Sequence, residues 1–228
     1  MDLKMLSKGN VLVFGDVILD KYISGNVDRV SPEAPVPVLK PSKEEIRLGG
    51  AANVALNLSS LGSNTTLIGV TGRDDSSIQI NELLKKNNIK NALTKSNNPT
   101  ITKLRLLAAQ QQLIRIDNEE EFSEEDWKSS LSSYKKQIKL KKNQVLIISD
   151  YDKGVVSTKG AAELIKKAKK EDMMASRAVK NTVRPMPTYL VVSNRGHFSN
   201  SSRLAPEQKI KNLLITPILW SLCVNYFF

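Results

Sequence analysis

The sequence is poor in the residues that build disulfide frameworks and zinc sites. It has one cysteine, Cys223, and one histidine, His197, among 228 residues. A single cysteine excludes an internal disulfide. One cysteine and one histidine are also too few for a zinc site made of these ligands. A reducing compartment fits this composition. We therefore expect a cytoplasmic protein.

Long apolar runs are also scarce. Residues 1–10 are polar, and the apolar run at 11–14 is too short for the core of a secretory signal. The apolar stretch at 213–228 is interrupted by Pro217 and Asn225. It is shorter than the ~20 apolar residues that a membrane helix requires. We expect neither a secretory leader nor a membrane partner.

Acidic residues are nearly absent from the last quarter of the chain. After Asp172 the sequence contains no aspartate and one glutamate, Glu207, and this segment carries more than half of the net charge of +11. A basic segment can bind nucleic acid or an anionic membrane. However, no nucleic-acid-binding motif with interleaved aromatic residues accompanies the charge. A solvated basic surface is the preferred interpretation, and nucleic acid is not a favoured partner.

The first 172 residues show strand patterns that alternate with helix patterns. Buried strands are predicted at 11–14, 65–70 and 144–149, helices at 51–61, after 75, at 123–138 and at 157–170, and a loop at 91–98. This order favours an α/β fold in which helices cover a mostly parallel sheet.

A second group of strands, at 21–30, 36–40 and 101–117, is predicted outside that sheet. Three prolines make 31–38 extended and exclude a central strand there. Within 101–117, alternation predicts a hairpin, and Lys103 and Arg105 emerge on the same side of their strand. Two cations on one side can receive a phosphate. From the spacing of Lys103 and Arg105 alone, an exposed cationic face of an edge strand is as good an interpretation as a phosphate site.

Candidate ligand-binding residues follow the buried strands. Asp16 closes the strand at 11–14, Asp20 follows it, and Asp150 closes the strand at 144–149. Open α/β sheets bind ligands at this edge. Gly49 and Gly50 form a turn before the helix at 51–61. Taken alone, a glycine turn of this kind is more often the start of an ordinary buried helix than a ligand-binding motif.

Several motifs in this order resemble one family. The segment 49–55, with Gly62 and Gly72 at their spacings, is similar to the first signature of the ribokinase-like, PfkB-type carbohydrate kinases. The likeness is greatest to the kinase domain of bacterial heptose-7-phosphate kinase/adenylyltransferase, and it runs from about Asn10 to about Asp172. The segments that carry it are 15–20, 31–38, 99–105, 111–117 and 149–154.

The resemblance implies a ribokinase-like three-layer fold with a mostly parallel central sheet and a small β lid, of which the carboxyl-terminal half is missing here. The implied reaction is the ATP-dependent phosphorylation of D-glycero-D-manno-heptose 7-phosphate at its anomeric hydroxyl. That step belongs to ADP-heptose and lipopolysaccharide core biosynthesis. ATP and Mg²⁺ are the implied cofactors, a sugar phosphate is the implied partner, and the lid is expected to supply a homodimer contact.

The resemblance also assigns roles to individual residues. Polar side chains and glycines at the sheet edge are expected to form the sugar site, with the lid cations on the distal phosphate. The expected substrate-binding residues are Asp16, Asp20, Gly49, Gly50, Asn53, Lys103, Arg105 and Arg115. Asp150 and Lys153 are expected near the transferred phosphate or a metal, whose ligands stay unassigned.

Catalytic segments of the family are absent from the sequence. Phosphoryl transfer requires a base and an anion hole, which the family takes from a Gly-Ala-Gly-Asp segment. This sequence contains no such segment and no Asp-Pro-Lys segment, and after Asp172 it has no Asn-x-x-Glu segment; in the family these last two serve nucleotide and metal binding. We therefore assign no catalytic residue and expect this chain to be inactive as a kinase.

The change in composition near Met173 suggests two parts. Residues 1–172 are predicted to be the amino-terminal half of a sugar kinase domain with its lid, and residues 173–228 a divergent, poorly ordered basic tail. We hypothesise that the reading frame changes near Met173, through a frameshift, a splice difference or an error in the gene model. Two other hypotheses are a non-catalytic remnant that binds a sugar phosphate or pairs with an intact kinase, and a basic tail that binds nucleic acid or an anionic membrane.

Overall fold

A computed structural model describes residues 9–109, 111–138, 144–156, 160, 163–167, 174–180 and 187–192. The strands are β1 (Asn10–Gly15), β2 (Val17–Val30), β3 (Pro37–Gly49), β4 (Asn64–Ile68), β5 (Val70–Thr71), β6 (Lys90–Asn91), β7 (Thr94–Lys95), β8 (Thr102–Ala108), β9 (Gln111–Asn118), β10 (Gln144–Asp150), β11 (Met174–Lys180) and β12 (Pro187–Val192). The helices are α1 (Gly50–Ser60), α2 (Asp75–Lys86) and α3 (Glu124–Ile138).

Within the described residues the main sheet has the strand order β12-β11-β10-β1-β4-β6. β1 is a central strand and pairs in parallel with β10 on one side and β4 on the other. The pairings of β4 with β6 and of β10 with β11 are also parallel, whereas β12 is antiparallel. The mostly parallel α/β sheet predicted from the sequence is therefore confirmed.

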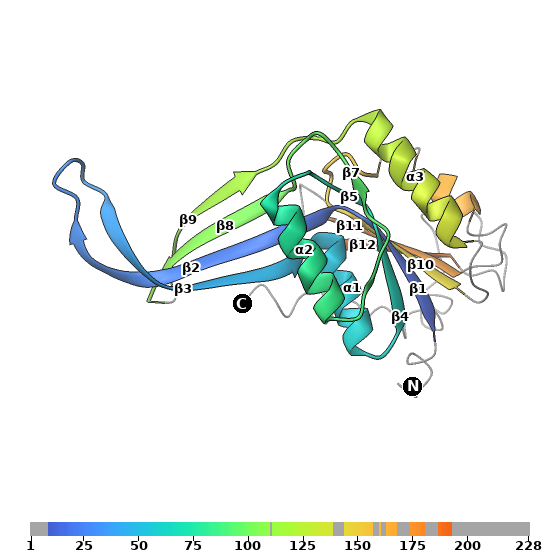
Figure 1. The fold of residues 1–228 in the computed structure, drawn as a ribbon, viewed down its shortest axis with the longest axis horizontal. Helices are drawn as coiled ribbons and strands as arrows, with labels where there is room; N and C mark the ends of the chain where they lie inside the picture. The colour runs from blue at the N-terminus through green and yellow to red at the C-terminus, as the bar shows by residue number, and fades with distance from the viewer. Residues whose placement is uncertain are drawn as a thin grey trace.

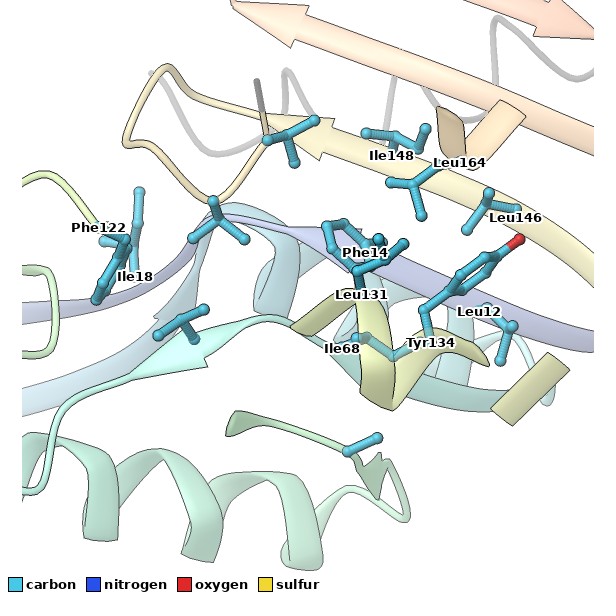
Figure 2. Close-up of a cluster of buried hydrophobic side chains, with 14 of the residues drawn as sticks. Leu12, Phe14, Ile18, Ile68, Phe122, Leu131, Tyr134, Leu146, Ile148 and Leu164 are labelled. Carbon is cyan, nitrogen blue, oxygen red and sulfur yellow. The ribbon is translucent and has the colours of Figure 1, made fainter. Parts of the chain in front are cut away.

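Helices cover both faces of this sheet because successive residues of β1 are apolar and point to opposite sides. Val11 and Val13 of β1 pack in a cluster with α1 and α2. Leu12 and Phe14 belong to a second cluster with α3 (Figure 2). In that second cluster the Phe14 ring meets the fully buried Tyr134 ring edge-on, with the centroids 6.2 Å apart. These two cores on opposite faces produce three layers.

The four-stranded sheet, in the order β3-β2-β8-β9, extends away from the main sheet and is called the lid below (Figure 1). β3 lies at one edge of the lid, so the prediction that its prolines exclude a central strand holds. The extended conformation expected at 31–38 begins only at Pro37, because the preceding residues form the bend between β2 and β3, where the Ser31 amide donates to the Val36 carbonyl oxygen at 2.9 Å. β8 and β9 form the predicted hairpin and pair antiparallel. The lid joins the main sheet where β1 leads into β2 and where β3 leads into α1.

The predicted helix boundaries agree well with the structure. Gly62 follows the end of α1 with φ +86°, the left-handed conformation expected of a residue that terminates a helix. At the start of α3, the Ser123 hydroxyl accepts a hydrogen bond from the Asp126 amide at 3.2 Å. The Asp126 carboxylate accepts one from the Ser123 amide at 3.0 Å. This reciprocal pair is a capping box.

Two other local predictions were wrong. The strand expected at 65–70 divides at Gly69, where a Cβ atom would lie 2.5 Å from the Gly15 carbonyl oxygen. The expected loop at 91–98 contains β7, which pairs with β5, and the end of β6. On α2, Ile80 and Leu84 face the core, whereas Ile78 is 56% exposed. Two-residue strands are too short to leave an alternating pattern.

The sheet also continues beyond residue 172, although residues 173–178 show no strand periodicity in the sequence. β11 follows and pairs with β10 from Val145↔Met174 to Asp150↔Val179. Main-chain pairing defines this strand, and such pairing does not require a side-chain period. Part of the helix expected at 157–170 is described, and residues 163–167 are helical. Residues 193–228, with His197, Glu207 and Cys223, lie outside the described residues.

No helix in the described part of the chain has the length and apolar content needed to cross a membrane.

Candidate functional site

The candidate site lies where β1 and β10 end, beside the first turn of α1 and the base of the lid. Asp16 stands between β1 and β2, and its amide donates to the Ser149 carbonyl oxygen at 3.1 Å. Its own carbonyl oxygen accepts from the Ala51 amide at 2.8 Å. The main chain of Asp16 therefore connects β10 to the start of α1, which places this residue at the expected ligand-binding edge of the sheet.

The Asp16 carboxylate is fully buried and is held by the loop that follows β10. One oxygen accepts from the amides of Tyr151 at 2.6 Å and Lys153 at 3.4 Å, and the other accepts from the Val155 amide at 3.3 Å. Burial raises the pKa of Asp16 to about 7, and the nearby Asp150 carboxylate adds to the rise, although the three amides oppose it. Asp16 thus has a proton equilibrium near neutral pH.

Gly49 and Gly50 allow the acidic residues to approach the start of α1. A Cβ atom at Gly49 would lie 2.2 Å from an oxygen of the Asp20 carboxylate. Gly50 has φ +55°, and a Cβ atom there would lie 2.3 Å from the Asp16 carbonyl oxygen. The sequence suggested that the glycines admit a sugar. In the structure, the groups that lie against them are the side chain of Asp20 and the main chain of Asp16.

Asp20 forms an ion pair with one of the predicted phosphate ligands. Its Oδ1 lies 2.6 Å from Nη1 of Arg105, and both side chains are less than one-fifth exposed. Arg105 also lies beside the Tyr22 ring, with its Cζ 5.1 Å from the ring centroid. Tyr22 belongs to β2, which lies between β8 with Arg105 and β3 with Arg47. The Cζ atom of Arg47 lies 4.8 Å from the centroid of the same ring.

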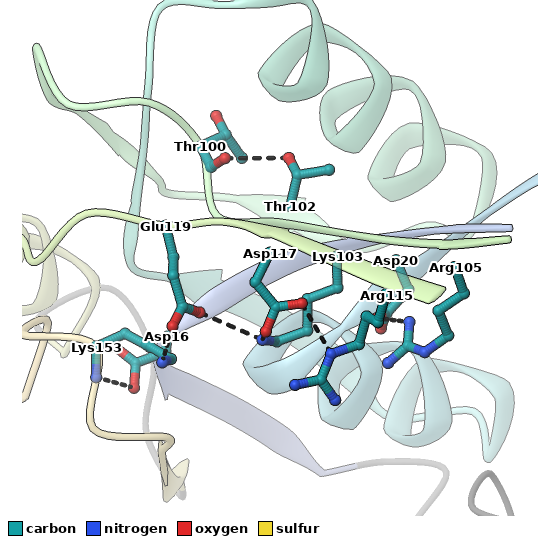
Figure 3. Close-up of polar contacts among 10 residues, drawn as sticks. All are labelled: Asp16, Asp20, Thr100, Thr102, Lys103, Arg105, Arg115, Asp117, Glu119 and Lys153. Atoms are coloured by element: carbon teal, nitrogen blue, oxygen red, sulfur yellow. Dashed lines mark hydrogen bonds and ion pairs between the residues drawn. The ribbon is translucent and has the colours of Figure 1, made fainter. Parts of the chain in front are cut away.

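Lys103 is the centre of a chain of ion pairs along the lid (Figure 3). Its Nζ lies 2.8 Å from Oδ2 of Asp117 and 3.2 Å from Oε2 of Glu119. Glu119 also pairs with Lys153 at 2.6 Å, and this interaction lowers the pKa of Glu119. Arg115 pairs with Asp117 at 2.8 Å. The chain of charges therefore joins the lid to the loop that holds Asp16.

The register explains why these charges meet. Lys103 stands opposite Asp20 on β2 and opposite Asp117 on β9, so all three residues share one face of the lid. Arg105 stands opposite Arg115 and belongs to the same face. Figure 3 shows these charged side chains on one side of the strands and Thr102 on the other. The prediction that Lys103 and Arg105 emerge on the same side is confirmed.

The remaining candidate residues lie close to this group. Asn53 is half-buried in the first turns of α1, and its side chain makes no hydrogen bond within the described part of the chain. Asp150 is buried at the end of β10 and accepts from the Asp152 amide at 3.0 Å. The structure thus gathers the predicted residues at one end of the main sheet and on one face of the lid.

Four residues at the site were not found from the sequence: Tyr22, Arg47, Asp117 and Glu119. Asp117 and Glu119 bind the predicted lysines, while the Tyr22 ring lies beside both Arg105 and Arg47. For Tyr22 and Asp117 the signal was present in the alternation of β2 and β9. However, the partner of each residue depends on strand register, which the sequence does not state.

Residues 8–193 match the family described as pfkB family carbohydrate kinase. The chain belongs to this family. The matched region includes β11 and β12, so it extends past residue 172, where the sequence resemblance was expected to end.

The curated relatives are longer than this chain. It is 43% identical over 173 residues to the bifunctional protein HldE of Hydrogenovibrio crunogenus, an alignment that covers 76% of this chain and 35% of that protein. It is 46% identical over 166 residues to HldE of Proteus mirabilis, covering 72% of this chain and 34% of that protein. The chain therefore spans about a third of the length of these relatives.

Solved structures share the fold. Phosphofructokinase-2 from Escherichia coli in complex with fructose-6-phosphate superposes with a TM-score of 0.58 at 17% identity, covering 77% of this chain and 55% of that chain. A carbohydrate kinase from Agrobacterium tumefaciens gives a TM-score of 0.53 at 16% identity, covering 73% and 53%. The ribokinase-like fold predicted from the sequence is confirmed.

ATP and Mg²⁺ are the cofactors that the family implies, and the side chains at the site can be compared with the ligands that Mg²⁺ requires. The described residues contain no cluster of three or more side chains suited to hold a metal ion. Asp16 already accepts three amide hydrogen bonds, and Asp150 accepts at least one. These residues do not fit a resident Mg²⁺, and we assign no catalytic step to the metal.

Proposed function

We propose that this chain binds a sugar phosphate, with heptose 7-phosphate as the substrate class, and that the polypeptide by itself does not transfer a phosphoryl group. The observation that carries the proposal is the placement of Asp20, Lys103 and Arg105 on one face of the lid, which an ion pair of Glu119 with Lys153 joins to the loop that holds Asp16. Carboxylate and amide oxygens suit sugar hydroxyls, and the cations suit a phosphate. Membership of the pfkB family and the HldE relatives support this assignment.

Binding requires an exchange of partners on the lid. Lys103 and Arg105 are paired with carboxylates in the ligand-free chain. A phosphate that carries two negative charges can replace one carboxylate on each cation, because it offers more acceptor oxygens to the same donors. The displaced Glu119 keeps Lys153 as its partner. In the ligand-free chain, the carboxylates therefore neutralise Lys103 and Arg105 and keep both side chains in position in a partly buried site.

Calorimetry with heptose 7-phosphate and without ATP tests the proposal. We expect saturable binding by the full chain, and a Lys103→Gln variant that binds roughly 10-fold or more weakly because a charge-assisted hydrogen bond is lost. A Lys40→Gln variant is the matched control, since Lys40 is an exposed residue of β3. Absence of binding by the wild-type chain, or equal affinity in both variants, would contradict the proposal.

The catalytic part of the proposal has its own tests. Because the sequence contains no Gly-Ala-Gly-Asp segment, we expect no sugar-dependent ATP hydrolysis by purified 1–228. Measurable turnover would show that another residue serves as the base. We also propose the change of reading frame near Met173. Translation of the two other frames downstream of Asp172 should reveal Asp-Pro-Lys followed by Gly-Ala-Gly-Asp, and their absence would remove that idea.

We further propose that the lid pairs with a second lid, in a homodimer or with an intact kinase. The face opposite the charges carries Leu104 and Leu106, which stand across from Ile116 and Ile114. Ile114 and Ile116 are 51% and 48% exposed. A contiguous apolar face on an edge hairpin favours association, because burying it removes apolar surface from water.

A further inference from the structure

The Tyr22 ring lies close to guanidinium groups from both neighbouring strands of the lid. Tyr22 belongs to β2, whose neighbours are β3 with Arg47 and β8 with Arg105. The Cζ atoms of Arg47 and Arg105 lie 4.8 Å and 5.1 Å from the ring centroid. Arg105 stands directly opposite Tyr22 in the register, while Arg47 stands opposite Asp20. Three adjacent strands therefore bring two like charges to one aromatic ring.

Such an arrangement requires compensation, because like charges repel. The ring face carries negative charge density and attracts both guanidinium groups. Each arginine also has a carboxylate partner: Asp20 on Nη1 of Arg105 at 2.6 Å, and Glu45 on Nε of Arg47 at 2.7 Å. A guanidinium carries five N–H donors, which is more than one carboxylate can accept. A phosphate with two negative charges can compete with these carboxylates for the guanidinium donors.

Arg47 lies close to the proposed sugar site because it precedes the glycine turn at the start of α1. It lies two residues before Gly49, whose missing side chain makes room for Asp20. Its side chain is 38% exposed, so a ligand can reach it, whereas the Arg105 side chain is 15% exposed. The more accessible arginine and the more buried one flank the same ring.

We propose that Arg47 binds the phosphate end of the sugar phosphate together with Arg105, and that Tyr22 is a positioning residue that holds the two guanidinium groups in register. This inference rests on the proposed function, since it concerns the same ligand. Each of the two planar forks can donate to two oxygens of the phosphate. Tyr22 limits the freedom of both forks before the ligand arrives, which reduces the entropy lost on binding.

Calorimetry on the full chain with heptose 7-phosphate, and with the same heptose lacking the phosphate, tests the role of Arg47. We expect Arg47→Gln to weaken binding of the phosphorylated sugar roughly 10-fold, with no change for the unphosphorylated sugar. Arg29→Gln makes the same change of charge at an exposed position of the same hairpin. It should bind both ligands as the wild-type chain does.

Two conservative variants test the positioning role of Tyr22. Tyr22→Phe keeps the ring and should retain wild-type affinity, whereas Tyr22→Leu should weaken binding of the phosphorylated sugar alone, by about three- to tenfold. Thermal unfolding of each variant shows whether the fold is preserved. If a variant melts early, Arg47→Lys provides the second test, because it keeps the charge but loses the fork, and we expect it to bind more weakly than wild type.

The outcomes separate the two proposals. Wild-type affinity in Arg47→Gln, or an equal loss for both sugars, would overturn the role of Arg47 and leave sugar-phosphate binding intact. A wild-type chain that does not bind the phosphorylated sugar would overturn the proposed function and this inference together. Equal weakening by Tyr22→Phe and Tyr22→Leu would overturn the positioning role of the ring, because the hydroxyl would then be the group that matters.

Discussion

Replacing Asp16 by asparagine removes a buried carboxyl group whose protonation is coupled to folding. The pKa of Asp16 rises from an ordinary 3.8 to about 7 in the folded chain, chiefly because burial disfavours the charged form. Between these two values the folded protein keeps a proton that the unfolded chain releases. The contribution of Asp16 to the free energy of unfolding is therefore complete below about pH 4. It is lost progressively as the pH rises toward 7.

The size of this effect follows from the two pKa values. One pH unit between them is worth about 1.36 kcal/mol. Over the whole range the wild-type chain loses about 4 kcal/mol of stability through Asp16. Between pH 5 and pH 8 the loss is about 2.5 kcal/mol, because the part that belongs to the range below pH 5 has already been lost. The Asp16→Asn variant has no proton to release at this position, so its stability lacks this term.

Urea unfolding of the two chains at several pH values between 5 and 8 measures the term. We expect the difference in unfolding free energy, Asp16→Asn minus wild type, to become more favourable to the variant by about 2.5 kcal/mol across that range. Any constant cost of the new amide group against the amides of Tyr151 and Lys153 cancels in this comparison. Asp28→Asn is the matched control, since Asp28 is exposed on β2, and its difference from wild type should vary little with pH.

A difference that stays constant from pH 5 to 8 would refute the reasoning. It would mean that the three amides of the 151–155 loop outweigh burial, so that Asp16 is ionised throughout. Carbon-13 NMR of the Asp16 carboxyl group then decides directly, because a pKa near 7 moves its chemical shift in the neutral range. The same titration predicts that sugar binding weakens below pH 7, where Asp16 gains a proton and loses acceptor capacity.

Two further predictions concern the turn and the lid. Gly49→Ala should lower the unfolding free energy by about 1–3 kcal/mol, because the new methyl group would overlap the Asp20 carboxylate. Urea titrations should show a smaller loss when the same change is made in an Asp20→Ala background. An unchanged loss in that background would mean that the overlap with Asp20 is not the cause. Ile114→Lys combined with Ile116→Lys should convert any dimer to a monomer in sedimentation equilibrium while leaving sugar-phosphate affinity intact; a wild-type chain that is monomeric at high concentration would contradict pairing through the lid.

Much of the architecture was predictable because its signals are local. The apolar runs of β1 and β10, the serine and aspartate at the start of α3 and the glycine after α1 each depend on residues close in sequence. Alternation along β8 and β9 indicated the hairpin and the shared side of Lys103 and Arg105. The ordered motifs were sufficient to indicate the family, which the match over residues 8–193 confirmed.

The sequence by itself determined which chemical groups are available: the carboxylates after the buried strands, the paired glycines and the lid cations. Only the tertiary structure decided how they are paired. Asp16 meets amides more than 130 residues away, and Asp20 meets Arg105 across 85 residues. Such partners are fixed by strand register and by loops that close over long distances, neither of which leaves a local pattern. The glycine pair at 49–50 shows the difference most clearly, since its sequence predicted a turn and its packing against Asp16 and Asp20 gave that turn its role.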